Sequence, residues 1–484
     1  MNKRIPTLVA LAALALCSYA QEAGFRLDAV DYEIDGITRR FVLELAAEIE
    51  LGRSFETREQ LDAYAEEIRQ RLSNQRQLES VDVEVAVDES SVPASATLLI
   101  RTKDSWNIIA LPQPKYDSNS GLQLNVKARD YNFLGTFQKL SIDLIYEDDL
   151  AGTRTFELYS NVSVPFMAWG LVWSASFTQS LGWVLGDASG SAYSADAGLG
   201  VSLPLGALSL GLSVNQGLSL NELDDDGTRF DDFWYLRNSA SASIGGALFE
   251  DVGILRTVSW NAYTGIGGNW RPGGDVGDSR RGPTWSLGAG LSGGGSDWIG
   301  NFRKGVTTSL SAPWSYNLWS GDWTGRLDFS ANGFLPLGLI GPSGRVRAFG
   351  ILTGASDTAA GGDIRGILNA RVSADKAVFM NLDLPARVLV FDPESWFGKS
   401  WMRYFGFELQ ASVFADAGLT DLSGAWLGSG MELLVFPSAA RSLIGRVSFG
   451  VDPIAVIENR SLTAPSSRDG AGAYEIFIGL DTHY

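Results

Sequence analysis

The chain has 484 residues, 45% of them hydrophobic, and a formal net charge of -18. So acidic a protein is a poor ligand for polyanions, which disfavours nucleic acid as a partner. With one cysteine and one histidine, the sequence predicts no disulfide, no metal site and no cofactor, and a Ser-His-Asp centre is disfavoured, so we expect no enzyme.

The N-terminus has the pattern of a secretory signal peptide. Two basic residues precede an apolar run that ends at Leu16, and "SYA" then supplies small residues for cleavage after Ala20. The predicted signal peptide is residues 1–20. Cys17 lies inside it and is discarded on this interpretation; lipidation of Cys17 stays open as an alternative, although the leucine before it is a poor fit to the small residue expected there.

Residues 24–104 are charged, contain few glycines and alternate between strand and helix patterns. A strand is expected over Phe25–Ile34. Thr38 is the expected N-cap of a first helix, in which three apolar residues recur at helical spacing: Phe41, Leu45 and Ile49.

A second helix follows the break "GRSF". Thr57 and Gln60 resemble a capping box, and the helix they open has a predicted buried stripe of Leu61, Tyr64, Ile68 and Leu72. Two strands with period-two alternation come next, "SVDVEVAVDE" and "SATLLIRTKD". The predicted order is therefore β-α-α-β-β.

This order, with its glycine-containing break and "LESVDVEV" entering the second strand, resembles a POTRA domain, a polypeptide-transport-associated module. Some other small periplasmic α+β domain is the alternative. The resemblance implies that an unfolded polypeptide is received by β-augmentation along an open strand edge. "SVDVEVAV" and its neighbouring strand are the candidates for that edge.

From Trp106 onward the helical period is replaced by strict alternation, as in "GLQLNVKA" and "KLSIDLIY". A sheet with one apolar face fits a soluble sandwich or an outer-membrane barrel. The barrel is favoured because the alternation continues to the C-terminus and because aromatic residues gather near strand ends, as in "FMAWGLVW" and "WSYNLW". We predict an all-β transmembrane barrel over residues 105–484 with about 16 antiparallel strands, within a segmentation range of about 16 to 18.

The last strand, "AYEIFIGLDTHY", ends on an aromatic residue. Its pattern resembles the terminal signal that marks outer-membrane proteins for assembly. The residues that share one face of this strand are Tyr474, Ile476, Ile478, Leu480 and Tyr484. An acidic connection, "ELDDDGTRFDDF", is similar to a calcium loop, but Phe233 stands where a bidentate glutamate is needed, so a solvated loop is expected.

An isolated arginine, Arg365, lies among glycines and aliphatic residues in "GGDIRGIL". Some fifty residues later, the alternation of "FELQASVFADAG" turns Asp416 toward the barrel lumen, and that of "WLGSGMELLVF" does the same for Glu432. We expect Arg365 to fold back into the lumen and pair with Asp416, with Glu432 as a second acceptor. A solvated loop arginine without a fixed partner is the alternative.

These segments carry a family resemblance. "DIRGI" (Ile364, Arg365, Gly366) resembles the V/I-R-G-F/Y loop motif of the BamA-like outer-membrane assembly superfamily, and "FADAG" (Phe414, Asp416, Gly418) resembles its F-x-D-x-G strand motif. "DSNSGLQLNVKARDYNFLG" resembles the start of that family's barrel, with its characteristic turn at Asn132, Phe133, Leu134 and Gly135. Two departures are Ile367 in place of the usual aromatic residue and a single POTRA domain where several are common.

The resemblance implies a protein of the outer membrane with its POTRA domain in the periplasm, acting as an assembly or insertion factor at the barrel seam. Membrane lipids and unfolded outer-membrane proteins are the implied partners, with periplasmic chaperones or accessory lipoproteins as further candidates. A two-partner-type secretion transporter and a passive pore or structural barrel are the alternatives. Pro112 and Pro114 lack amide donors, which fits a labile seam or a linker before the first full strand.

Overall fold

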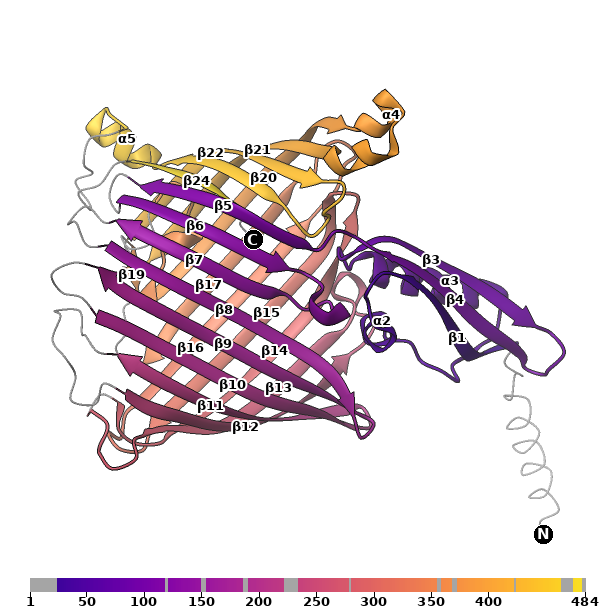
Figure 1. Ribbon diagram of the computed structural model, residues 1–484, viewed down its shortest axis with the longest axis horizontal. Coiled ribbons are helices and arrows are strands. Elements are labelled where there is room, and N and C mark those ends of the chain that lie inside the picture. Colours follow the sequence, from indigo (N-terminus) through magenta and orange to yellow (C-terminus); the bar gives the residue numbers. More distant parts are fainter. Residues whose placement is uncertain are drawn as a thin grey trace, which may run out of the picture. The chain divides into compact units, whose positions relative to one another are not determined.

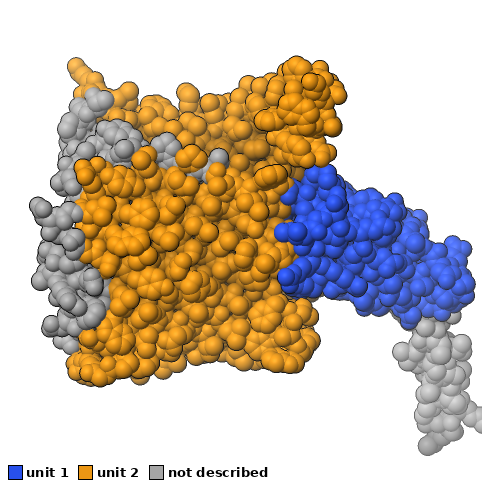
Figure 2. All heavy atoms as spheres, viewed as in Figure 1, with its two compact units in different colours: residues 1–105 blue, residues 106–484 orange. Residues whose placement is uncertain are grey.

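The computed structural model describes residues 24–117, 121–148, 154–185, 190–221, 234–277, 280–354, 358–367, 372–421, 424–462 and 473–480. The predicted signal peptide with Cys17, the acidic loop at 222–233 and the terminal Tyr484 lie outside these residues. The chain divides into two compact units, residues 1–105 and 106–484, which Figure 2 colours separately. None of the helices in the described ranges is long and apolar enough to cross a membrane.

The N-terminal unit contains a mixed four-stranded sheet in the order β2-β1-β4-β3. Strands β1 and β4 are parallel, whereas β3 and β4 are antiparallel. The elements follow the predicted order, with one additional short strand, β2: β1 (Phe25–Asp35), α2 (Arg40–Ala47), β2 (Ser54–Phe55), α3 (Arg58–Ser73), β3 (Leu78–Asp88) and β4 (Ala94–Asp104).

Helix α3 forms as its capping and periodicity predict. The Thr57 side chain accepts a hydrogen bond from the Gln60 amide at 3.3 Å, while the Gln60 side chain accepts from the Glu56 amide at 2.9 Å. The predicted stripe is buried in the core of this unit, at no more than 4% exposure: Leu61, Tyr64, Ile68 and Leu72.

The start of helix α2 was predicted wrongly. Its N-cap is Arg39, without a side-chain cap, because the Thr38 hydroxyl donates instead to Asp104 at the end of β4 (2.6 Å). The helix therefore begins later and turns a different face inward, and Leu45 is 45% exposed. Its buried residues are Val42, Leu43 and Ala47 rather than Phe41, Leu45 and Ile49.

The second unit is a closed barrel in which strands that follow one another along the chain pair antiparallel (Figure 1). The described residues form eighteen barrel strands, which confirms the fold class at the upper end of the predicted range rather than at 16. Several connections are only two residues long, such as the one between Ile299 and Phe302. A strand with its connection therefore takes fewer residues than expected, and more strands fit into the same length of chain.

The strands follow the chain around the wall, and β24 closes the ring beside β5. Their bounds are β5 (Ile108–Asp117), β6 (Gly121–Asp130), β7 (Leu140–Asp148), β8 (Arg154–Ala168), β9 (Leu171–Leu185), β10 (Gly190–Leu205), β11 (Leu208–Asn221), β12 (Trp234–Phe249), β13 (Val258–Trp270), β14 (Thr284–Ile299), β15 (Phe302–Asn317), β16 (Trp323–Phe334), β17 (Ser343–Thr353), β20 (Lys376–Phe391), β21 (Phe407–Thr420), β22 (Gly424–Pro437), β23 (Gly445–Val451) and β24 (Tyr474–Leu480).

The barrel has a polar inside and an apolar outside. On β21, Gln410 and Asp416 are buried at 1% and 2% exposure, whereas Val413 between them points outward at 59%. Met431 and Leu433 on β22 are likewise outward, at 61% and 47%. A soluble sandwich buries its apolar face, so this pattern with closure identifies a membrane-spanning barrel.

The two ends of the barrel differ. At one, here called the turn end, short connections join most strands; the exception is the β20–β21 connection with α4 (Pro393–Phe397) and η6 (Ser400–Phe405). At the opposite loop end lie the longer connections, including α5 (Pro453–Asn459) and the β17–β20 connection with η4 (Gly361–Asp363) and the ribbon of β18 (Thr358–Ala359) and β19 (Ser373–Ala374).

The predicted barrel-start turn lies between β6 and β7 at the turn end. Asn132 is fully buried, and its side chain accepts a hydrogen bond from the Phe137 amide at 2.9 Å. The 3-10 turn η1 (Phe133–Gly135) contains Leu134 at φ 54° and Gly135 at φ 71°. The asparagine side chain thus holds a left-handed turn that the backbone alone would not favour. A second short turn, η2 (Gly253–Leu255), joins β12 to β13.

Candidate functional site

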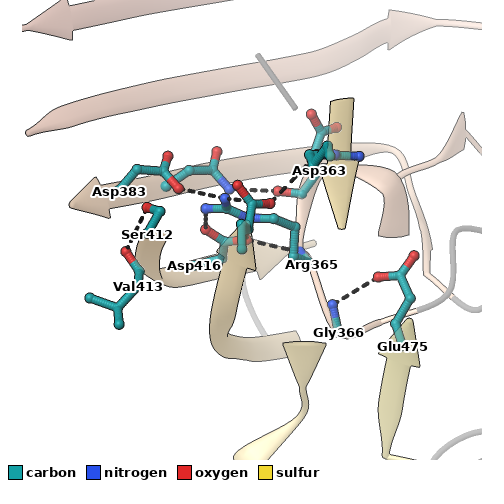
Figure 3. A network of polar contacts seen from close by, with 11 residues as sticks. Asp363, Arg365, Gly366, Asp383, Ser412, Val413, Asp416 and Glu475 are labelled. Atoms are coloured by element: carbon teal, nitrogen blue, oxygen red, sulfur yellow. Dashed lines mark hydrogen bonds and ion pairs between the residues drawn. The ribbon is translucent and has the colours of Figure 1, made fainter. Parts of the chain in front are cut away.

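The β17–β20 connection folds from the loop end into the barrel interior. Its described central residues, Ile364 to Ile367, are buried, with Arg365 only 3% exposed. Figure 3 shows Arg365 pointing among carboxylates that come from the barrel wall. A loop charge in water would be exposed, so Arg365 belongs to the interior of the fold.

Arg365 and Asp416 form a two-pronged ion pair. The guanidinium donates from Nε to Asp416 Oδ2 at 2.9 Å and from Nη2 to Oδ1 at 2.7 Å, and the Arg365 amide donates to Oδ2 at 2.9 Å. The Arg365 guanidinium also lies 3.8 Å from the centroid of the Phe414 ring. Phe414 therefore contacts the face of the guanidinium, and Asp416 binds its edge. Both side chains point into the lumen from the same strand, two residues apart, so they hold the same cation.

Two further carboxylates reach Arg365 from neighbouring strands. Asp383 on β20 accepts from Nη1, and Glu432 on β22 lies 3.3 Å from the same nitrogen. Arg446 on β23 lies 3.6 Å from Glu432 and so offsets part of the negative charge. Asp383 was not predicted, although the alternation of "FMNLDLPA" places it on the lumen side together with Asn381.

Glycines let the loop backbone lie directly against the strands. Gly366 has φ 90°, and a Cβ there would lie 2.7 Å from the Val451 nitrogen. A Cβ on Gly428 of β22 would lie 2.1 Å from the Arg365 carbonyl oxygen, and one on Gly418 would lie 2.5 Å from Ile364. Gly418 and Gly428, here called the glycine floor, thus leave space for the loop against the barrel wall. Gly418 of the strand motif therefore has a packing role.

Asp363, just before the motif, fastens the loop to β17. Its carboxylate accepts from Arg347 at 2.5 Å, and Arg345 lies 3.6 Å from its other oxygen. The Asn381 side chain donates to the Asp363 carbonyl at 2.8 Å. This contact was not predicted, because two arginines two residues apart on one strand gave no signal of their shared partner.

An apolar cluster supports the polar contacts. Ile364 and Ile367 pack with Phe349 of β17 and Phe379 of β20, and Phe379 is fully buried. Ile367, which departs from the aromatic residue of the family motif, is 4% exposed within this cluster. An aliphatic side chain therefore fills the position at the loop tip.

The loop also contacts the closing strand. The Gly366 amide donates to Glu475 of β24 at 2.9 Å, a contact visible at the right of Figure 3. Arg446, beside Glu432, lies 3.9 Å over the ring of Phe477 on β24. The same cluster that holds Arg365 thus reaches the strand that closes the barrel.

The remaining predicted residues lie elsewhere. Ile476 and Ile478 of β24 point outward at 51% and 49% exposure, as the terminal pattern requires. The Leu480 side chain and Tyr484 are outside the description. Within the described residues, no group of histidine, cysteine and carboxylate side chains is arranged to hold a metal ion.

The hydrogen bonds and ion pairs of this loop fix it against four barrel strands and the closing strand. Breaking such a pair by removing one partner costs about 3–5 kcal/mol, because the other charge stays buried.

The sequence matches no protein-family model, and comparison with curated proteins gave no match. Solved structures do match. CdiB from Escherichia coli has a TM-score of 0.52 at 12% identity, covering 95% of this chain and 76% of that one. CdiB from Acinetobacter baumannii gives 0.49 at 14% identity, with 95% and 74% covered. BamA from Haemophilus ducreyi lacking POTRA domains 1–3 gives 0.37 at 12% identity, with 94% and 85% covered.

Proposed function

We propose that this chain, whose fold is that of the BamA-like outer-membrane assembly superfamily, is an outer-membrane factor that inserts or translocates polypeptides. On this proposal the N-terminal unit is a periplasmic POTRA domain that receives an unfolded client, and the barrel seam between β24 and β5 is where the client is handled. The observation that carries the proposal is the anchoring of the Arg365 loop to strands that lead to this seam.

The N-terminal sheet supports client capture by strand addition. Strand β3 (Leu78–Asp88) lies at the end of the sheet order, and no other strand in the described residues pairs with its outer side. An eleven-residue free edge offers backbone donors and acceptors to an extended peptide. The neighbouring β4, the other predicted candidate, lies between β1 and β3 and has no free edge, so that part of the prediction is wrong.

The seam has few donors on its β5 side. The Tyr131 amide donates to the Asn107 carbonyl at 2.9 Å, which places the odd-numbered backbone groups of β5 toward β6. Even-numbered groups therefore face β24, and Pro112 and Pro114 remove two of those amides. The Ile108 carbonyl, on the same side, accepts from the Trp106 indole instead.

The Arg365 loop and the residues around it contact the closing strand β24 from inside the barrel. Glu475 accepts from the loop at Gly366, and Phe477 lies under Arg446. Both residues belong to β24, whose described part is seven residues long. We propose that these contacts keep β24 in place while its ladder with β5 opens to a client strand.

Depletion of the protein tests this function. We expect the levels of other barrels in the outer membrane to fall, measured by quantitative proteomics of isolated outer membranes. Re-expression of the wild-type chain is the control and restores them. Unchanged levels of every other barrel would contradict the proposal.

A dedicated secretion transporter is the second candidate. It is favoured by the lumen wall opposite the Arg365 loop, where small hydroxyl side chains pair across strands, such as Ser213 with Ser241 at 2.7 Å. Loss of one exported protein with all other barrels normal would support this function. Normal barrels together with normal export would favour the passive pore.

A further inference from the structure

The β14–β15 hairpin leaves the barrel wall at the turn end. Its tip, Gly295–Lys304, makes contacts with β21 and β22, which lie several strands away in the sheet order. Six strand spacings separate β14 from β22, about 29 Å along the wall at about 4.8 Å per strand. Side chains cannot bridge that distance, so the tip must cross the interior.

Two glycines, one on each strand, allow the hairpin to bend. Gly294 has φ 88° and Gly305 has φ 130°, in the region that favours glycine. A Cβ on Gly294 would lie 1.9 Å from the Val306 carbonyl oxygen, and a Cβ on Gly305 would lie 2.2 Å from the Gly295 carbonyl oxygen. The strand ladder nevertheless continues past the bend to Ile299 and Phe302. The tip is therefore an ordered hairpin that folds inward as a unit.

An apolar contact holds the tip in its crossed position. Trp298 packs against the buried cluster of Leu434, Phe436 and Ile444 on the opposite side of the lumen. Arg303 lies between two rings, 5.0 Å from that of Trp298 and 5.3 Å from that of Phe334. The tip thus fills the lumen with large side chains at this end.

Polar contacts fasten both sides of the tip. The Gln410 side chain on β21 donates to the Asn301 carbonyl at 3.3 Å. On the other side, Asp297 accepts from Arg256 in the β12–β13 turn. Between the tip and the Arg365 cluster remains a cavity of about 90 Å³, room for only a few water molecules.

Beyond the tip, the lumen is hollow and polar. Cavities of about 310 and 340 Å³ lie against β10–β14 and β13–β17, lined in part by Asn215, Ser239, Ser286 and Thr324. Tyr263, Trp314 and Ile351 also line the second cavity, but most of the lining of the first is polar or glycine, and such a wall suits water and an extended hydrophilic chain.

We propose that the hairpin tip, Gly295–Lys304, is a gate that closes the lumen at the turn end and that its displacement makes the barrel a water-filled conduit. Gly294 and Gly305 are the hinge, and the packing of Trp298 holds the gate closed. This inference does not rest on the proposed assembly function, because it concerns passage through the lumen rather than release at the seam.

Conductance in planar lipid bilayers tests the gate with the full chain. We expect Trp298→Ala to raise the mean conductance several-fold over the wild type. Trp285→Ala is the matched control: Trp285 lies on the same strand, is 42% exposed and contacts Trp323, so its removal should leave the conductance unchanged. Heat-modifiable migration in gels verifies that each variant contains a folded barrel.

A crosslink provides the second arm. The mature chain predicted from the sequence has no cysteine, so Asn301→Cys with Gln410→Cys places a unique thiol pair across the contact. A short cleavable thiol crosslinker should lower the conductance below the uncrosslinked level, and cleavage should restore it. Folded Trp298→Ala protein that conducts like the wild type, or a crosslink without effect on conductance, would overturn the gate. Neither result would bear on the depletion experiment.

Discussion

Two arginine clusters in this molecule have the same stoichiometry and opposite surroundings. In the N-terminal unit, Arg101 pairs with Glu33, Asp82 and Glu84 on the exposed face of the sheet, where its side chain is 38% exposed. In the barrel, Arg365 also has three carboxylate partners, but its side chain is 4% exposed. Composition alone therefore does not decide what an ion cluster contributes.

The difference lies in the solvent. Water screens the Arg101 cluster and solvates any charge left behind when a partner is removed. Around Arg365 there is room for only a few water molecules, so each charge depends mainly on the others. An arginine with three carboxylates therefore forms part of a hydrated surface in the N-terminal unit, whereas in the barrel it holds a loop in place.

The largest effect is expected from Arg365→Ala. Removal of the guanidinium leaves three carboxylates buried close together, at a cost of about 3–5 kcal/mol in the free energy of unfolding. We expect the barrel to insert but to unfold at lower urea concentration and to lose activity in the depletion assay. Equilibrium unfolding in detergent or lipid vesicles measures the change, and an unchanged urea midpoint would contradict the cluster's role.

A smaller effect is expected when the loop is displaced but every charge is kept. Gly428→Ala places a Cβ against the Arg365 carbonyl and should destabilise the protein by about 1–3 kcal/mol through forced backbone shifts. Gly333→Ala on β16 is the matched control, because a Cβ there meets nothing within 4 Å. Equal unfolding curves for the two variants would refute the glycine floor.

Removal of the link to the closing strand should cost less again. Glu475→Ala leaves the Gly366 amide without this acceptor, for about 1–3 kcal/mol if the amide stays dry and less if water replaces the carboxylate. We also expect faster hydrogen exchange in β24, since its support from the loop is weakened. If hydrogen exchange in β24 were as slow as in the wild type, the loop would not stabilise the strand at the seam.

Arg101→Ala should have the smallest effect. We expect an unfolding transition of the N-terminal unit within experimental error of the wild type. The hydrogen bond from Arg101 lowers the pKa of Glu84, so that pKa should return toward its ordinary value, which an NMR titration of the side chain would detect. A marked loss of stability would show that exposure does not distinguish the two clusters.

Patterns within one element were predictable from the sequence. The stripe of α3 and the lumen parity of Phe414 and Asp416 follow from local periodicity, which the final fold preserves. The position of Arg365 also followed, because an isolated cation among buried residues needs an anion and the alternation offered Asp416.

Contacts that join distant strands were not predictable. Gly366 meets Glu475 and Gln410 meets Asn301, each pair 109 residues apart in the chain. Such contacts depend on the number of strands and on the bend at Gly294, which no local pattern specifies. The start of α2 was missed for the same reason, because Thr38 bonds to Asp104 rather than to its own helix.

A double-mutant cycle on Arg365 and Asp416 tests the central claim most directly. Arg365→Ala, Asp416→Asn and the double variant are unfolded with urea in the same vesicles, and the coupling free energy is the departure from additivity. A buried pair in direct contact predicts a coupling of about 0.5–3 kcal/mol, with the double variant less destabilised than the sum of the two single variants. Additive and mild effects would mean that the guanidinium and the carboxylate do not hold the loop inside the barrel.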